Sequence, residues 1–227
     1  TPGSARPRDI DSGLACPPNR DHRGPRTGGP LGTGYLCHYP TKSMNTARGV
    51  KQSAVHDRLA AERAYFKDVS GWEGADWFAP KGVEPVVERL SWGRQNWFPY
   101  WESEHRAARE GVILMDMSFM SKFAVQGRDA GRLLDRLSAN NVDAEPGKIT
   151  YTQWLNDAGL IEADLTVTKL GDENYLVVAS DTAHRHVETW IRRHIDADEN
   201  AFVTDMTSGY AQLNVQGPRS RELLQAI

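Results

Sequence analysis

The sequence predicts an α+β fold in which antiparallel sheets pack against helices, and three observations support this. Three strand-like segments at 149–155, 160–170 and 175–180 follow one another, joined by NDAG and GDEN, which carry the Asn, Asp and Gly chemistry of tight turns. Segments with apolar residues at helical spacing flank these strands. A unit made of a strand, a glycine and a helix also occurs twice.

The composition is that of an ordinary globular protein. Of its 227 residues, 39% are hydrophobic and 25% charged, which allows a buried core. The net charge of -3 gives no electrostatic case for a nucleic-acid or anionic-membrane partner. No apolar run approaches the roughly 20 residues of a membrane-spanning helix. Only Cys16 and Cys37 are present, so neither a disulfide framework nor a CxxC metal motif is expected.

The N-terminal segment, residues 1–34, is predicted to be a disordered tail rich in Gly, Pro and Arg. It holds seven Gly, six Pro and five Arg but few large aliphatic residues, so it cannot bury enough surface to order itself. A basic targeting or nucleic-acid arm is the alternative, but three Asp interrupt the Arg residues and no aromatic residues are interleaved. We therefore expect an extension, or sequence not native to the domain that follows.

The next segment, 35–101, is predicted to contain a helix and an aromatic-rich linker. Residues 53–66 show apolar residues near helical spacing, and Ser53 can cap the helix. Between Trp72 and Trp101 lie five Trp, interrupted by three Pro. This pattern predicts an extended linker held by buried aromatic rings. A base-stacking or aromatic-cage site is the alternative, although basic residues are sparse there.

From residue 102 onward the sequence alternates between short helices and strands. Before the three-strand meander we expect a polar helix at 102–110, strands at 112–117 and 122–126, and a helix at 129–137. After it we expect a helix at 181–195 with Asp181 as N-cap, strands at 202–206 and 210–215, and a last helix after Pro218.

The repeated unit begins at Leu114 and again at Val203. LMDMSFMSKFAVQGRDAGRLLDRL and VTDMTSGYAQLNVQGPRSRELLQAI share DM[ST], VQG and LL at matching positions. Gly127 and Gly217 each allow a strand to turn into a helix; a phosphate cradle is the alternative, with no GxGxxG to support it. Three strands and a helix follow the first copy, whereas the second reaches Ile227 within its helix, so we expect the second unit to be incomplete.

Asp164 is the candidate functional side chain. In the segment 160–170, one face is expected to carry Ile161, Ala163, Leu165 and Val167, and the other Glu162, Asp164, Thr166 and Thr168. Asp is disfavoured in the middle of a strand. It is either a solvated residue on an exposed face or, if another domain covers that face, a partly desolvated acid or base. The seven His show no metal-ligand spacing, and no GxSxG motif is present, so no metal site is expected.

Five segments in order resemble a known family. RGVKQSAVHDRL, GWEGADWFAP, WESEHRAAREGVILMDMSFMSKFAVQG, ITYTQWLNDAGLIEADLTVTKL and NVQGPRSRELL resemble the C-terminal half of dimethylglycine and sarcosine dehydrogenases, and the glycine-cleavage T protein, an aminomethyltransferase. The resemblance covers residues 35–227. It implies that 35–101 leads from a missing flavin domain and that 102–227 is the N-terminal part of a T-protein-like folate-binding domain, incomplete at its C-terminus.

The resemblance also implies a function. The flavin domain would oxidise an N-methyl amine to an iminium, and the folate domain would pass that carbon to tetrahydrofolate, giving 5,10-methylenetetrahydrofolate. Asp164 matches the family's catalytic, folate-binding Asp, and Tyr151 matches a position lining the folate pocket. The family usually has two Gly in the preceding turn, where this chain has Gly159 and Leu160.

The partners implied are a small-molecule folate and the flavin domain of the full-length enzyme, with FAD only in that upstream domain. The location implied is the cytoplasm in a bacterium or the mitochondrial matrix in a eukaryote. A regulatory subunit of pyruvate dehydrogenase phosphatase resembles the same family without the catalytic role, so a non-catalytic regulator is one alternative. An inactive fragment is another.

Overall fold

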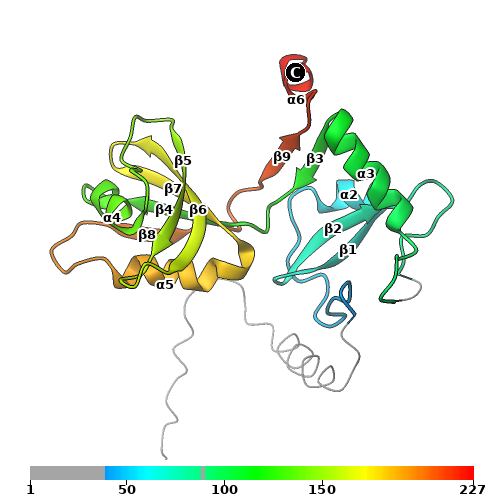
Figure 1. Ribbon diagram of the computed structural model, residues 1–227, viewed down its shortest axis with the longest axis horizontal. Coiled ribbons are helices and arrows are strands. Elements are labelled where there is room, and N and C mark those ends of the chain that lie inside the picture. The colour runs from blue at the N-terminus through cyan, green and yellow to red at the C-terminus, as the bar shows by residue number, and fades with distance from the viewer. Residues whose placement is uncertain (1–38, 88–89) are drawn as a thin grey trace, which may run out of the picture.

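A computed structural model describes residues 39–87 and 90–227, in which a hairpin lobe and a larger sheet lobe are joined by a thin connection (Figure 1). The predicted tail, 1–34, lies outside the described residues. All ladders between named strands in the described residues are antiparallel, which confirms the predicted α+β class. No helix in the described part of the chain combines the length and apolarity needed to cross a membrane.

The hairpin lobe corrects the prediction for residues 53–66. Helix α2 (His56–Ala61) is short, and strands β1 (Ala64–Val69) and β2 (Trp72–Phe78) follow. Ser53 does not cap the helix, whose N-cap is Val55. Arg63 breaks the helix, because its φ of 68° lies in the left-handed region. The turn between the strands has φ 49° at Ser70 and 92° at Gly71, the conformation that a two-residue hairpin turn requires.

The aromatic segment is therefore not wholly an extended linker. Part of it is strand β2, and helix α3 (Phe98–Glu110) begins before the end of the expected linker. The expected packing role of the aromatic rings is confirmed for Trp77 and Trp97, which are 0% and 1% exposed and stack with centroids 6.2 Å apart. These two rings form the core of the hairpin lobe.

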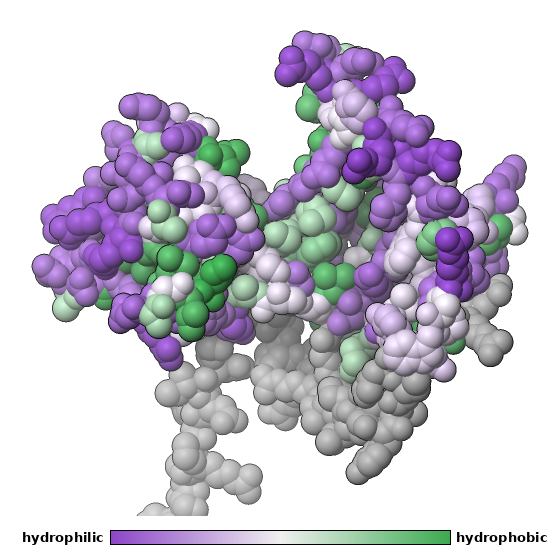
Figure 2. Space-filling view, in the orientation of Figure 1, coloured by the Kyte–Doolittle hydropathy of each residue, from purple (hydrophilic) through white to green (hydrophobic). Residues whose placement is uncertain are grey.

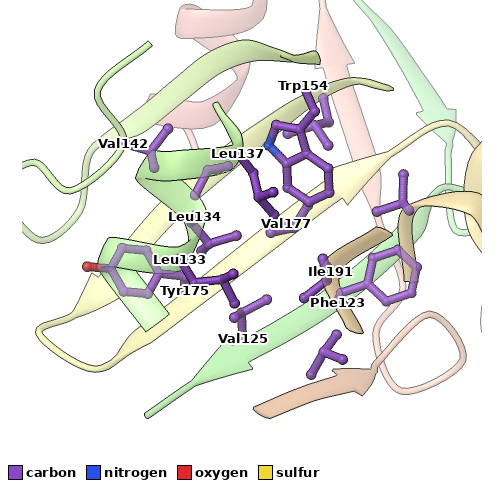
Figure 3. Packing of buried hydrophobic residues seen from close by; sticks show 14 of the residues in the cluster. Phe123, Val125, Leu133, Leu134, Leu137, Val142, Trp154, Tyr175, Val177 and Ile191 are labelled. Atoms are coloured by element: carbon purple, nitrogen blue, oxygen red, sulfur yellow. The ribbon is translucent and has the colours of Figure 1, made fainter. Parts of the chain in front are cut away.

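The sheet lobe contains five strands in the order β5-β6-β7-β4-β8. Their bounds are β4 (Ser121–Gln126), β5 (Ile149–Leu155), β6 (Ile161–Gly171), β7 (Asn174–Ala179) and β8 (Phe202–Asp205). Helices α4 (Ala130–Leu137) and α5 (His184–Arg193) supply side chains to one core on the inner face of this sheet (Figure 3). The predicted meander is thus confirmed as β5, β6 and β7.

The predicted helix at 181–195 is divided. A 3-10 turn, η1 (Asp181–Ala183), precedes α5, and no side-chain cap hydrogen bond is present at either element. Asp181 instead accepts a hydrogen bond from Ser70 Oγ in the hairpin lobe. The prediction that Asp181 caps the helix was wrong because its carboxylate accepts a hydrogen bond from a residue 111 positions away in the sequence.

The two repeated units exchange strands. Strand β3 (Ile113–Asp116) of the first unit pairs with β9 (Leu213–Gln216) of the second, and β8 of the second pairs with β4 of the first. The hydroxyls of the two DM[ST] motifs make equivalent contacts: Ser118 Oγ accepts from Gln212 N, and Thr207 Oγ1 accepts from Lys122 N, each at 3.1 Å. The repeat seen in the sequence is thus an interlocked pair related by approximate two-fold symmetry.

The two repeat glycines are required by close packing. Gly127 and Gly217 have φ of 120° and 121°. A Cβ at Gly127 would lie 2.3 Å from Asn200 O, and one at Gly217 would lie 2.3 Å from Gly111 O. Each glycine therefore allows a distant backbone segment to pack against it, and this close packing explains why a glycine is needed there.

The helices of the two units differ in how much of their apolar face is covered. In α4, Leu133 and Leu134 are 0% exposed beneath the five-stranded sheet. Their counterparts in α6 (Ser220–Gln225), Leu223 and Leu224, are 41% and 54% exposed. Figure 2 shows α6 on a projecting arm, with a hollow between that arm and the sheet lobe.

Candidate functional site

The structure places Asp164 on the outer face of β6, away from the helices. Ala163, Leu165 and Val167 are 5%, 3% and 0% exposed and point into the core, whereas Asp164 is exposed. The predicted alternation along this strand is therefore confirmed for these residues. It is wrong for Ile161, which is 67% exposed and lies next to a register shift in the β5–β6 ladder. Asp164 lies opposite Gln153 of β5, whose Nε2 donates a hydrogen bond of 3.0 Å to Asp164 Oδ1.

Tyr151 lies on the same face, two residues before Gln153 on β5. Its ring is 60% exposed. Interaction with the Asp164 carboxylate raises the pKa of the Tyr151 phenol, with smaller contributions from burial and from the carboxylate charge. The two candidate residues from the sequence thus meet, and Gln153 joins them as a third.

Gln153 escaped the sequence analysis because its pairing depends on register. A glutamine two residues after Tyr151 shares its face, and that spacing was the available signal. The side chain matters because an amide N–H donor fixes the carboxylate that it binds and leaves the second carboxylate oxygen free to accept another hydrogen bond. The result is a Tyr151–Asp164–Gln153 cluster on an open sheet face.

The turn before this strand is well formed despite its single glycine. Asn156 Oδ1 accepts from the backbone N–H groups of Ala158 and Leu160, each at 3.0 Å, and Gly159 has a φ of 75°. Asn156 Nδ2 also donates to Glu162 Oε1 at 2.8 Å. A side-chain cap from Asn therefore supports the turn without a second glycine.

Lys122 is a buried lysine on this same face that the sequence analysis did not identify. It lies in one lateral row with Tyr151, Thr166 and Val178 across the sheet. Its residue exposure is 3%, and its Nζ donates to Ser118 O at 2.9 Å and Met120 O at 2.7 Å. Burial lowers the pKa of Lys122, although the nearby carboxylates oppose this shift. Its contacts fix the turn after the first DM[ST] motif.

The arrangement supplies a fixed carboxylate with a phenol and an amide beside it. Such a group can orient an amine by accepting its hydrogen bond and can take up its proton. The exposed apolar side chain of Ile149, 65% exposed, is two residues before Tyr151 on the same strand face and offers packing area to a ring. Within the described residues there is no group of three or more His, Cys, Asp or Glu positioned to hold a metal ion.

Comparison with known proteins gives one family match and several relatives. The model of the GCVT N-terminal domain matches residues 55–227. A 4-methylaminobutanoate oxidase (formaldehyde-forming) from Paenarthrobacter nicotinovorans is 40% identical over 209 residues, covering 92% of this chain and 25% of the relative. The human mitochondrial sarcosine dehydrogenase is 26% identical, covering 85% of this chain and 25% of the relative.

A solved structure shows the same fold. The glycine cleavage system aminomethyltransferase T from Bartonella henselae superimposes with a TM-score of 0.61 at 20% identity, covering 78% of this chain and 43% of that one. The chain spans about a quarter of the length of the two relatives described above. The family match begins at residue 55, so it includes the hairpin lobe as well as the sheet lobe.

Proposed function

Because the chain belongs to the family of the GCVT N-terminal domain, we propose that its outer sheet face binds tetrahydrofolate and takes part in folate-dependent one-carbon transfer. The observation that carries the proposal is the Asp164 carboxylate, held by Gln153 Nε2 at 3.0 Å and close enough to Tyr151 to raise the pKa of its phenol. The relatives named 4-methylaminobutanoate oxidase and sarcosine dehydrogenase support the same interpretation.

The finer proposal concerns the source and the product of the carbon unit. Bound tetrahydrofolate supplies the two amines that bond to the carbon. The bond from this carbon to its original nitrogen breaks, the demethylated amine leaves with one of the two protons that the folate amines lose, and the product is 5,10-methylenetetrahydrofolate. The carbon comes from an iminium formed by a flavin domain of a longer protein, which holds the FAD. This chain would then contribute residues of a folate site within a larger dimethylglycine- or sarcosine-dehydrogenase-like enzyme.

The chemistry required of the chain fits the cluster. Asp164 accepts a hydrogen bond from an amine of the folate ring and takes up the proton that this amine loses as its new C–N bond forms. Gln153 holds the carboxylate in place, since the amide donates to one of its oxygens. Tyr151 lies on the same face and offers an exposed ring against which a flat ligand can pack.

Calorimetric titration of the chain with tetrahydrofolate tests this function. We expect binding that Asp164→Asn weakens about tenfold or more, because a hydrogen bond to a charged group contributes roughly 1.5–3 kcal/mol. Asp157→Asn, which removes the same charge from the turn of the same hairpin, is the matched control and should bind as the parent does. Equal weakening by both variants would show a general charge effect instead.

The same titration also tests the alternative that the chain is a non-catalytic regulator. A chain that is folded by circular dichroism but takes up no tetrahydrofolate would contradict the proposal for this chain and favour the regulator or the inactive fragment. The Asp164 carboxylate favours the enzyme, because a regulator has no need of a positioned proton acceptor on an open face.

A further inference from the structure

A cavity lies between the two lobes, away from the Tyr151–Asp164–Gln153 cluster. Its volume is about 240 Å³, and none of the three cluster residues lines it. One wall comes from the hairpin lobe, where Lys51 and Trp72 are neighbours in a parallel bridge. The other wall comes from the sheet lobe, where Asp181 and Arg185 lie at the start of helix α5.

The charges around this cavity are mixed in sign. Lys51 and Arg185 are exposed and form no ion pair anywhere in the described residues; Lys51 Nζ lies over the Trp72 ring at 5.8 Å from its centroid. Asp181 and Asp205 face the same space. Each carboxylate already accepts hydrogen bonds, but a carboxylate can accept about four, so capacity remains.

The hydrogen bonds of the two carboxylates hold them in place. Asp205 accepts from Thr207 N at 2.9 Å and is bonded to His184 Nε2 at 3.0 Å. Asp181 accepts from Ser70 Oγ, and this is the sole side-chain hydrogen bond between the hairpin turn and the sheet lobe within the part of the chain that the structure describes. The cavity is therefore an ordered space bounded by two anions and by two cations that form no ion pair within the described residues.

The signs of the charges that line the cavity indicate which class of ligand fits it. A simple anion in this space would meet Asp181 and Asp205, and a simple cation would meet Lys51 and Arg185. A molecule that carries both charges can satisfy both pairs, and Trp72 provides an apolar surface for the methylene groups between them. The volume suits a metabolite smaller than the drug-sized ligands that fill cavities of about 300–1,000 Å³.

We propose that this cavity binds a small zwitterion with one carboxylate and one ammonium group, the carboxylate held by Arg185 and Lys51 and the ammonium by Asp181 and Asp205. The ligand joins the hairpin lobe to the sheet lobe, so its binding stabilises their contact in proportion to its occupancy. The site is independent of the folate face, which shares none of these residues.

Calorimetric titration with a charge-matched set of probes tests the proposal. The probes are β-alanine and 4-aminobutanoate, which carry both charges, and butanoate and butylammonium, which carry one each. We expect at least one of the zwitterions to bind about tenfold or more tightly than both singly charged probes, because each of these loses one charged contact and faces an unmatched charge. Butanoate binding as tightly as 4-aminobutanoate would overturn the proposal in favour of a plain anion site.

A matched pair of variants places the binding in this cavity. Arg185→Gln should weaken zwitterion binding about tenfold, whereas Arg193→Gln, on the exposed last turn of the same helix, should leave it unchanged. Equal losses in both variants, or no heat from any probe up to about 10 mM with a folded chain, would refute the site. Arg185→Gln should leave tetrahydrofolate binding as in the parent, so the two proposals fail separately.

Discussion

The duplicated helices allow one stability prediction with an internal control. Leu134 in α4 and Leu224 in α6 occupy equivalent positions of the repeat, but Leu134 is 0% exposed and Leu224 is 54% exposed. Leu134→Ala removes a fully buried side chain and leaves a cavity, for which about 2–5 kcal/mol of unfolding free energy is the usual loss. Leu224→Ala removes a side chain that is already half in water, and we expect a loss of about 1 kcal/mol or less.

Urea denaturation followed by fluorescence measures both variants. The expected result is a much lower unfolding midpoint for Leu134→Ala than for Leu224→Ala at unchanged slope, since a constant slope shows that the exposed area on unfolding is unaltered. Equal and large losses in the two variants would refute the reasoning. Repeating the measurement at several protein concentrations shows whether α6 is covered by a second copy, because association makes the midpoint depend on concentration.

Two further predictions concern the interface between the repeats and the acid stability of the sheet lobe. Gly127→Ala should destabilise the chain by several kcal/mol or prevent folding, because the new Cβ would lie 2.3 Å from Asn200 O at a φ of 120°. Gly82→Ala is the control: its Cβ would meet nothing within 4 Å at a φ of 88°, so it should lower the thermal midpoint less. Equal losses of thermal midpoint in the two variants would contradict this. Hydrogen bonding to Arg136 lowers the pKa of Glu199 from 4.5 to about 2. The ionised Glu199 therefore stabilises the fold above pH 4.5, and this stabilisation is lost as the pH falls towards 2. Glu199→Gln should flatten that part of an acid-unfolding curve, and an unchanged curve would contradict the prediction.

Local signals in the sequence predicted the sheet lobe well. NDAG and GDEN placed the turns of the meander, and the alternation around Asp164 placed its face, because strand periodicity is set by neighbouring residues. The helix expected at 53–66 failed at Arg63, where a left-handed backbone breaks the helix. Apolar spacing over so short a segment does not separate a helix turn from the start of a strand.

The exchange of strands between the repeats could not be predicted from local sequence patterns. The sequence showed two similar units, yet either unit could have paired its DM[ST] strand with its own VQG strand. The observed pairing of β3 with β9 and of β4 with β8 joins strands about 80–100 residues apart, and such non-local contacts leave no periodic trace in a single sequence. The Asp181 contact with Ser70 was unforeseen for the same reason.

The position of Asp164 depends on an irregularity that the sequence conceals. The hairpin turn pairs Leu155 with Ile161, and a regular ladder from that turn would set Asp164 opposite Thr152, a fully buried residue that faces the core. A register shift between Trp154 and Leu155 sets it opposite Gln153 instead. One inserted residue thus aligns the outer face of β6, which carries Asp164, with the outer face of β5, where Tyr151 lies, since a slip of one residue exchanges the two faces of a strand. Bulges are over-represented beside functional sites, and this one is what assembles the proposed folate-binding cluster.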